Sequence, residues 1–389
     1  MAVPVLWRAP VELWRLRRQS RHDGGAPRRH TLEANWAVEL TVTLGAVLLG
    51  LGPAVLIGAA CAILLFVRAN LRDVVRRQWS GRVRHSLKAR TPQAIASLKL
   101  EGGAIMLLEL EGPLFFGTAD GLRARLESLR ESVHTVILDL NQVGEIDVTG
   151  ARILFETAQD WEHEGRRLVF AEWGAHDPRR RMVETLASGN QRSWLNFADT
   201  ADLALEQAED ALLVRIDHRH DTTRLLSVGE TMIGRDLDDR ELEMLASKLR
   251  PLRFARGDTL FRVGDPGDSL YVSLQGDIGL RIPGGTRRLA SFAPGIIVGE
   301  MGMLSRGVRS AAAVAESDVV AVKLEGNDFE ELTRQHPELG AKLLRNISLQ
   351  LGERVRALTG DLGLWMSRTA ASGGHSVAVA RRDEGESVS

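Results

Sequence analysis

Hydrophobic and polar residues alternate along residues 93–212 in two ways, as short apolar runs and as stretches of helical periodicity. The pattern predicts strands at 104–110, 135–140 and 167–171 and helices at 119–129 and 150–161. Strands that alternate with helices favour a mainly parallel sheet covered by helices. The sequence therefore predicts an α/β domain over residues 93–212.

The second half of the chain has the two-residue period of antiparallel strands. Leu270, Val272 and Leu274 share one face, Gly276 interrupts the run, and the alternation resumes over 278–282. Glycine and proline residues separate these short runs, as the turns of a β-roll require. We expect a mainly-β domain here.

Two helices are expected to flank this β-roll. Asp238 and Glu241 have the spacing of a capping box, which predicts a helix over 238–249. A second helix carries an apolar stripe with a spacing of four residues, and we interpret this stripe as core or as a dimer contact. The stripe consists of Leu339, Leu343, Ile347, Leu351 and Val355. Together these elements predict a domain over residues 225–360.

A long apolar run covers residues 36–67, with Glu39 as its one charged residue. One continuous helix of this length would reach roughly 48 Å, which exceeds the roughly 30 Å of a hydrocarbon core. The run is interrupted near Pro53, and basic residues lie on both sides of it. We expect a short membrane helical hairpin with both ends in the cytoplasm, while a buried soluble hairpin is the alternative.

The amino-acid sequence of the α/β segment resembles that of a known family of domains. Residues 136–140 read Val-Ile-Leu-Asp-Leu, residues 146–150 read Ile-Asp-Val-Thr-Gly, and residues 112–119 add to the likeness. These segments are similar to STAS domains, in the branch found in SulP-type anion transporters. In that branch a pair of short membrane helices leads through a basic stretch into the STAS domain. The resemblance implies the C-terminal portion of such a transporter.

Thr149 lies where antagonist-type STAS domains carry a phosphorylatable residue. A phosphate there would lie at a helix N-terminus, where the helix dipole stabilises negative charge. The alternative is that Thr149 is an ordinary N-cap. Thr149 is therefore a candidate phosphorylation site, and Asp139 and Asp147 beside it are expected to organise the loop.

Residues 299–311 read Gly-Glu-Met-Gly-Met-Leu-Ser-Arg-Gly-Val-Arg-Ser-Ala. This segment resembles the phosphate-binding cassette of cyclic nucleotide-binding domains. A guanidinium matches the two free oxygens of a cyclic phosphate, which is the role expected of Arg309. A carboxylate accepts from the ribose 2′-hydroxyl, which is the role expected of Glu300. The predicted binding residues are Gly299, Glu300, Met301, Gly302, Arg309 and Ser310. The choice between cAMP and cGMP stays open.

The composition of the chain and the motifs it lacks argue against several classes of function. The chain has 389 residues, 44% of them hydrophobic, a net charge of −1 and a single cysteine, Cys61. A nearly neutral chain gives no reason to expect nucleic acid as a partner. The sequence contains no Walker loop, paired zinc spacing or nucleophile elbow. We therefore expect no enzyme and no metal, and we interpret His218, His220 and Asp221 as a solvated linker.

The predicted fold class is multidomain: a membrane helical hairpin, an α/β STAS domain and a mainly-β cyclic nucleotide-binding β-roll with flanking helices. The predicted divisions are a basic N-terminal segment over 1–35, the hairpin over 36–67, a basic juxtamembrane linker over 68–92, the STAS domain over 93–212, a linker over 213–224, the β-roll domain over 225–360 and a disordered tail over 361–389.

The predicted function is that of a membrane-attached regulatory protein, which senses cAMP or cGMP and modulates SulP-type anion transport through its STAS domain. It would lie at the inner (cytoplasmic) membrane with both domains in the cytoplasm. Its expected partners are the cyclic nucleotide, the membrane and either a transporter core or a second copy of the chain. The alternatives are a STAS partner-switching protein with a degenerate nucleotide site, or a truncated anion transporter.

Overall fold

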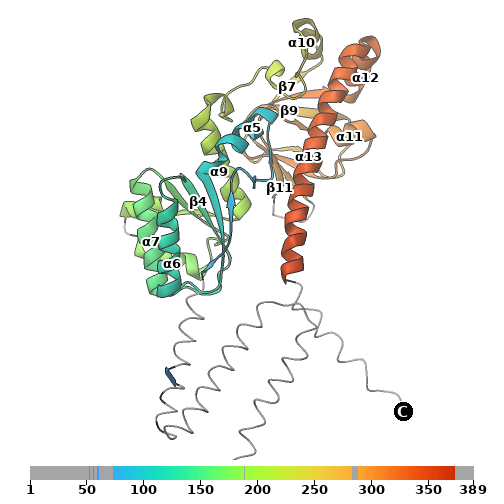
Figure 1. The fold of residues 1–389 in the computed structure, drawn as a ribbon. Coiled ribbons are helices and arrows are strands. Elements are labelled where there is room, and N and C mark those ends of the chain that lie inside the picture. Colours follow the sequence, from blue (N-terminus) through green and yellow to red (C-terminus); the bar gives the residue numbers. More distant parts are fainter. Residues whose placement is uncertain are drawn as a thin grey trace, which may run out of the picture.

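The computed structural model describes residues 73–187, 189–282 and 288–372, together with Gly52, Leu56, Ala59 and Ala60; the side chains of 189–191, 219 and 357–372 are not part of the description. Two domains follow one another along the described chain (Figure 1). The first is an α/β domain and the second is a β-roll.

The α/β domain has a five-stranded sheet in the order β1-β3-β4-β5-β6. Strand β1 is antiparallel to β3, and the other neighbours are parallel. The strands are β1 (Val75–Ser80), β3 (Ile105–Glu111), β4 (Thr135–Gln142), β5 (Arg167–Ala171) and β6 (Asn196–Ala198). The prediction of a mainly parallel sheet is confirmed, and β5 has the predicted bounds.

Helices cover both faces of this sheet (Figure 1). The helices are α5 (Pro92–Glu101), α6 (Phe116–Leu129), α7 (Val148–His163), α8 (Pro178–Leu186) and α9 (Ala201–Ile216). Neighbouring residues of β4 point to opposite faces, so Leu138 packs in the core with α6 and α7 while Ile137 packs in the core with α5 and α9. The sheet is therefore buried on both sides, which explains its continuous apolar runs.

The β-roll consists of two sheets around one core. Their orders are β2-β11-β10-β13-β8 and β12-β9-β14-β7. The strands are β2 (Lys88–Ala89), β7 (Arg250–Phe254), β8 (Thr259–Phe261), β9 (Ser269–Gln275), β10 (Ile278–Arg281), β11 (Arg288–Phe292), β12 (Ile297–Val298), β13 (Ala312–Ala315) and β14 (Val319–Glu325).

Helices flank the β-roll, as predicted. They are α10 (Asp239–Ala246), α11 (Glu300–Ser305), α12 (Gly326–Gln335) and α13 (Pro337–Ser372), and 3-10 turns lie at 102–104, 189–194, 218–220 and 228–230. The capping box of Asp238 and Glu241 is confirmed. Of the apolar stripe on α13, Leu339, Leu343 and Ile347 are core residues, whereas Val355 is exposed.

The predicted membrane hairpin is the part of the fold class that is contradicted. Within the described part of the chain, no helix combines the length and the apolar character that crossing a bilayer requires. Helix α13 is long enough, but charged residues such as Lys342 and Arg345 recur along it. The range 36–67 itself lies outside the described residues, apart from the four single residues named above.

The range 68–92, predicted as a basic linker, contains two strands instead. Strand β1 lies at one edge of the α/β sheet, and β2 pairs in parallel with β11 of the β-roll. Lys88 and Arg90 are buried, because they neutralise acidic residues of α9. These two cations are therefore not available to lipid headgroups, contrary to the expectation that they belong to a basic juxtamembrane linker.

Strand β2 makes the two domains share a buried junction. The Lys88 ammonium is 2.9 Å from a carboxylate oxygen of Asp210 on α9 and 2.9 Å from one of Asp277 in the β-roll. Glu206 on α9 pairs with Arg288 on β11 and accepts a hydrogen bond of 3.0 Å from the Ser291 hydroxyl. Charged groups of both domains thus neutralise one another across β2.

The predicted disordered tail over 361–389 overlaps the end of a helix. Helix α13 continues to Ser372. Residues 373–389 lie outside the described part of the chain.

Candidate functional site

The cassette over 299–311 is a turn, a short helix and a second turn between β12 and β13. Gly299 has φ +86° and Arg306 has φ +51°, so left-handed residues bound α11 on both sides. A Cβ on Gly299 would lie 2.5 Å from Nη1 of Arg309. Glycine is therefore required at position 299 both by the backbone and by the neighbouring guanidinium.

A second glycine contact fixes the cassette against the turn before β9. A Cβ on Gly267 would lie 2.6 Å from the Cα of Gly302. The Gly267 amide donates to the Gly307 carbonyl at 2.9 Å, and the Arg309 amide donates to the Asp265 carbonyl at 2.9 Å. The close approach that Gly302 permits is thus to protein backbone.

Arg309 is held in the middle of this arrangement and is only 4% exposed. Its Nη1 donates to the Gly299 carbonyl at 2.7 Å. Its Nη2 donates to the carbonyl of Ser269 at 2.8 Å and to the hydroxyl of Ser269 at 3.0 Å. The guanidinium also lies over the ring of Phe261, 4.4 Å from its centroid.

Arg309 nevertheless lacks a counter-ion. Among the described residues, no carboxylate lies within ion-pair distance of it, and its Nε is buried without a hydrogen-bond partner. Burial lowers the pKa of this guanidinium, and the more distant charges of Asp268, Asp265 and Glu300 only partly oppose the effect. A buried cation without an anion is costly. The arrangement therefore favours the arrival of an anionic ligand.

Glu300 begins α11 and is 1% exposed. Its carboxylate accepts a hydrogen bond of 2.8 Å from Nη1 of Arg354 on α13. Burial raises the pKa of Glu300, and Arg354 is the strongest opposing influence. Arg354 in turn lies 4.8 Å from the ring centroid of Phe292. The carboxylate predicted to read a ribose is thus engaged by a cation from the last helix.

Helix α13 is also bound to the strand that precedes the cassette. The side-chain amide of Gln350 accepts from the Ile297 amide at 2.8 Å and donates to the Ile297 carbonyl at 2.7 Å. Gln350 and Arg354 lie four residues apart and therefore on one face of α13. A movement of the cassette would therefore be transmitted to α13 through the contacts of Gln350 and Arg354.

The structure therefore brings Gly299, Glu300, Gly302 and Arg309 together. Met301 and Ser310 lie at the surface of the same segment, and both are exposed. The sequence reading missed Ser269, Phe261 and Arg354. Polar residues at 350 and 354, beside the apolar stripe of α13, were the available signal for Arg354.

Thr149 lies in the first turn of α7 and is exposed. The N-cap of this helix is Asp147, whose carboxylate accepts from the Gly150 amide at 2.6 Å. The interpretation of Thr149 as the cap was therefore wrong. Its phosphorylation remains a prediction.

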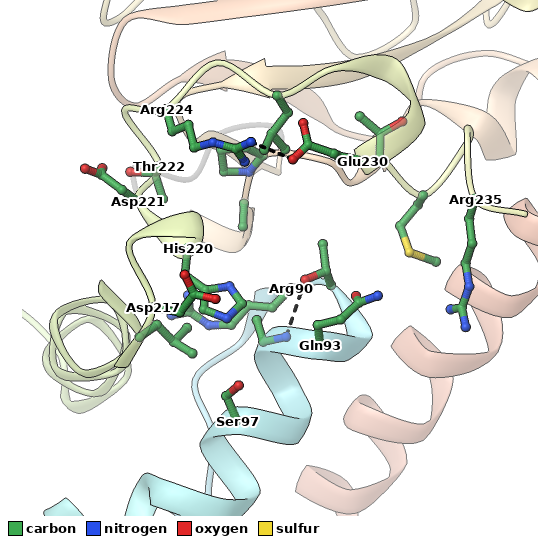
Figure 2. Close-up of a pocket in the computed structure, with 18 of the residues that line it drawn as sticks. Arg90, Gln93, Ser97, Asp217, His220, Asp221, Thr222, Arg224, Glu230 and Arg235 are labelled. Atoms are coloured by element: carbon green, nitrogen blue, oxygen red, sulfur yellow. Dashed lines mark hydrogen bonds and ion pairs between the residues drawn. The ribbon is translucent and has the colours of Figure 1, made fainter. Parts of the chain in front are cut away.

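A cavity of about 500 Å³ lies at the junction of the two domains. Figure 2 shows Gln93 and Ser97 of α5 on one side of it and Arg224 and Glu230 of the β-roll side on the other. Arg224 pairs with Glu230 at 2.6 Å, and Arg90 pairs with Asp210 on α9. These cations are already neutralised, unlike Arg309. We therefore take the cassette, rather than this cavity, as the candidate ligand site.

A pH-dependent stability is expected from the pair of Glu300 and Arg354. An acid whose pKa is raised on folding costs stability as the pH rises above its ordinary value of 4.5. Arg354→Gln removes the opposing cation, so the pKa of Glu300 should rise further. At neutral pH the free energy of unfolding of the variant should be about 1–3 kcal/mol lower than that of the wild type, and this difference should shrink in acid.

Urea unfolding at a series of pH values measures this difference. Arg345→Gln, at an exposed position on the same helix, is the matched control and should show no such trend. A loss of stability in Arg354→Gln that is the same at every pH would contradict the prediction.

Comparison with known proteins agrees with both domain resemblances. The model of the cyclic nucleotide-binding domain matches residues 251–336, and the model of the STAS domain matches residues 98–185. Glutaminase 2 of Bradyrhizobium diazoefficiens is 29% identical over 303 residues, which are 76% of this chain and 47% of that protein. The CRP-like cAMP-activated global transcriptional regulator of Mycobacterium tuberculosis is 30% identical over 122 residues, 31% of this chain and 54% of that protein.

The chain spans about half the length of these curated relatives. Among solved structures, the Catabolite Activator Protein of Thermus thermophilus has 30% identity and a TM-score of 0.31, and it covers 35% of this chain and 63% of its own. These matches give no support to a SulP transporter hairpin. This chain carries a STAS domain followed by a cyclic nucleotide-binding domain.

Proposed function

We propose that this protein is a cyclic nucleotide-responsive regulator in which the β-roll binds the ligand and the STAS domain passes the signal on. The observation that carries the proposal is the buried Arg309, which has no carboxylate partner among the described residues and whose guanidinium donates to Gly299 of the cassette and to Ser269 of β9. A cyclic phosphate would supply the missing negative charge. Glu300 would accept from the ribose once Arg354 releases it.

The junction supports the second half of the proposal. Strand β11 belongs to the β-roll. It pairs with β2, and its Arg288 forms an ion pair with Glu206 of α9. A shift of the β-roll would therefore reach α9 through buried contacts. Coupling between two sites of a protein is typically about 1–3 kcal/mol, which shifts an equilibrium without locking it.

Calorimetric titration of the full chain with cAMP and with cGMP tests the proposal. We expect saturable binding of at least one of them. Ligand at 100 times its Kd should stabilise the protein by about 2.7 kcal/mol. Hydrogen exchange should also slow in α9, which makes no contact with the ligand in this proposal. Absence of binding at millimolar nucleotide would remove the proposal, and binding without any change in α9 would remove the coupling.

Two resemblances favour different partners for the STAS domain to regulate. The likeness of residues 136–150 to the STAS domains of SulP-type transporters favours an anion transporter, with both domains on the cytoplasmic side of the inner membrane. The 303-residue match to Glutaminase 2 favours an amide-hydrolysing enzyme instead, because that match spans both domains. Co-purification of either protein with the full chain in a cyclic nucleotide-dependent way distinguishes the two.

The chain itself is proposed to have no catalytic activity. Glutamine hydrolysis by the purified chain would contradict this, and saturable sulfate or bicarbonate flux in vesicles would show that it is a truncated transporter. If the nucleotide site is degenerate, a partner-switching role of the STAS domain remains, and phosphorylation of Thr149 by a partner kinase would support that role.

A further inference from the structure

A second hollow, of about 270 Å³, lies on the STAS domain at the edge where the parallel strands begin. It is lined by the first residues of β3 and β4, Ile105 and Thr135, and by Leu212 of α9. The His134 amide donates to the Ala104 carbonyl at 2.8 Å, which holds these strand ends together. The hollow is separate from the cassette, which lies in the other domain.

Three arginines and one histidine line this hollow. Arg167 begins β5, Arg215 lies in the last turn of α9, and His134 precedes β4. Arg166 is the fourth, and its Nη1 donates to the Val133 carbonyl at 2.6 Å, so its position is fixed. The start of β5 and the last turn of α9, which are far apart in the sequence, thus place three arginines around one small space.

Negative charge at this place is scarce. Glu162 is the single carboxylate that lines the hollow, and Glu164 lies 3.5 Å from Nε of Arg166. Within the described chain, no carboxylate lies at ion-pair distance from Arg167 or Arg215. The hollow therefore has an excess of positive charge.

The pKa of His134 is affected by the same positive charges. Burial lowers the pKa of this imidazole, and Arg215, Arg166 and Arg167 lower it further. All three arginines line the same hollow as His134, which is why their charges act on it. The positive charge of these arginines, unlike the burial, favours an anion beside His134.

The hollow suits a small ligand. Pockets for organic ligands usually measure about 300–1,000 Å³, and this one, at about 270 Å³, lies just below that range. A guanidinium binds a tetrahedral oxyanion through paired, charge-assisted hydrogen bonds. We propose that this hollow of the STAS domain, formed by His134, Arg166, Arg167 and Arg215, binds a tetrahedral oxyanion, inorganic phosphate or sulfate.

The histidine is a built-in reporter for the test. The full chain is labelled with ¹³C at the histidine Cε1, and the pKa of His134 is measured by NMR in sodium chloride and in phosphate or sulfate at equal ionic strength. The signal is assigned with His134→Gln. A bound dianion offsets the guanidinium charges, so we expect a saturable rise of the His134 pKa in the wild type.

Variants separate binding from screening. In the double variant R167Q/R215Q the pKa of His134 should already be raised, and the response to the anions should be lost. Arg152→Gln, an exposed arginine on α7 of the same domain, should respond as the wild type does. Thermal unfolding of each variant checks that the fold is intact.

Each outcome of these measurements either supports or overturns anion binding in this hollow. A response to only one of the two anions supports the proposal and identifies the ligand. An equal pKa in chloride and in both anions would show that Arg167 and Arg215 act only as surface charges, and the proposal would fall. A response that persists in R167Q/R215Q would place the anion elsewhere and would overturn it as well.

Discussion

Arg309→Gln is expected to weaken cyclic nucleotide binding by about 100-fold, which corresponds to about 2.7 kcal/mol. The guanidinium is buried, lacks a carboxylate partner and lies beside Gly299 and Ser269. Each charge-assisted hydrogen bond to a phosphate contributes about 1.5–3 kcal/mol, and glutamine has no charge to offer. Calorimetric titration of the full chain measures the loss.

A matched control lies three residues away. The Arg306 side chain is 78% exposed and pairs with Glu330, so Arg306→Gln should leave the affinity nearly unchanged. Arg309→Lys keeps the charge but loses the planar pair of donors, so its affinity should lie between those of Arg309→Gln and the wild type. Equal loss in Arg306→Gln and Arg309→Gln would mean that only the overall charge of the cassette matters.

The loss of binding must also be separated from a loss of folding. Arg309 donates to two carbonyl groups of the protein, so Arg309→Gln is expected to lower stability as well. Urea unfolding without ligand measures that effect. A variant that is folded at the temperature of the titration and binds as the wild type does would refute the role of Arg309.

Lys88→Met is expected to destabilise the protein by about 3–5 kcal/mol at neutral pH, the usual cost of removing one partner of a buried ion pair. The Lys88 side chain is fully buried, and its ammonium is 2.9 Å from Asp210, 2.9 Å from Asp277 and 3.6 Å from Glu206. Methionine has a similar shape but leaves Asp277 without a cation, while Asp210 keeps Arg90 and Glu206 keeps Arg288; leaving a buried charge unpaired is the costly way to break an ion pair. The change in urea midpoint gives the magnitude.

The pH dependence of this variant has a definite sign. Burial raises the pKa of Asp277 although Lys88 opposes this, so Asp277 costs stability as the pH rises above its ordinary pKa. Without Lys88 the pKa of Asp277 should rise further. The difference between Lys88→Met and the wild type should therefore shrink as the pH falls.

Two further variants sharpen the experiment. The double variant K88M/D277N removes the carboxylate that Lys88→Met leaves unpaired and should recover part of the lost stability. Lys99→Met, at an exposed position at the end of α5, should have little effect. A Lys88→Met protein as stable as the wild type at neutral pH would show that the junction does not depend on this ion cluster.

Local patterns predicted much of the fold. The apolar run 167–171 is β5, because a strand buried on both faces reads as a continuous hydrophobic run. The capping box at Asp238 and Glu241 was recognisable, because both partners of a cap lie within one turn. The cassette was recognisable for the same reason, since Gly299 to Arg309 are close in sequence.

Long-range contacts escaped the pattern. Strand β1, with the sequence Val-Arg-Arg-Gln-Trp-Ser, has no apolar run, and it is a strand because it pairs with β3 at the edge of the sheet. Lys88 and Arg90 looked like surface cations, since nothing near them in the sequence reveals the acidic residues of α9 that cover them. The capping interpretation of Thr149 failed because Asp147 takes that position.

The sequence by itself therefore determined the two domain types and the residues of the cassette, because helix periods, strand runs and turn glycines are set by neighbours along the chain. Only the tertiary structure decided that Arg309 is buried without a carboxylate, that Arg354 engages Glu300, and that Lys88 joins the domains. The physical reason is that the charge a buried side chain experiences depends on groups that folding brings to it from distant parts of the chain.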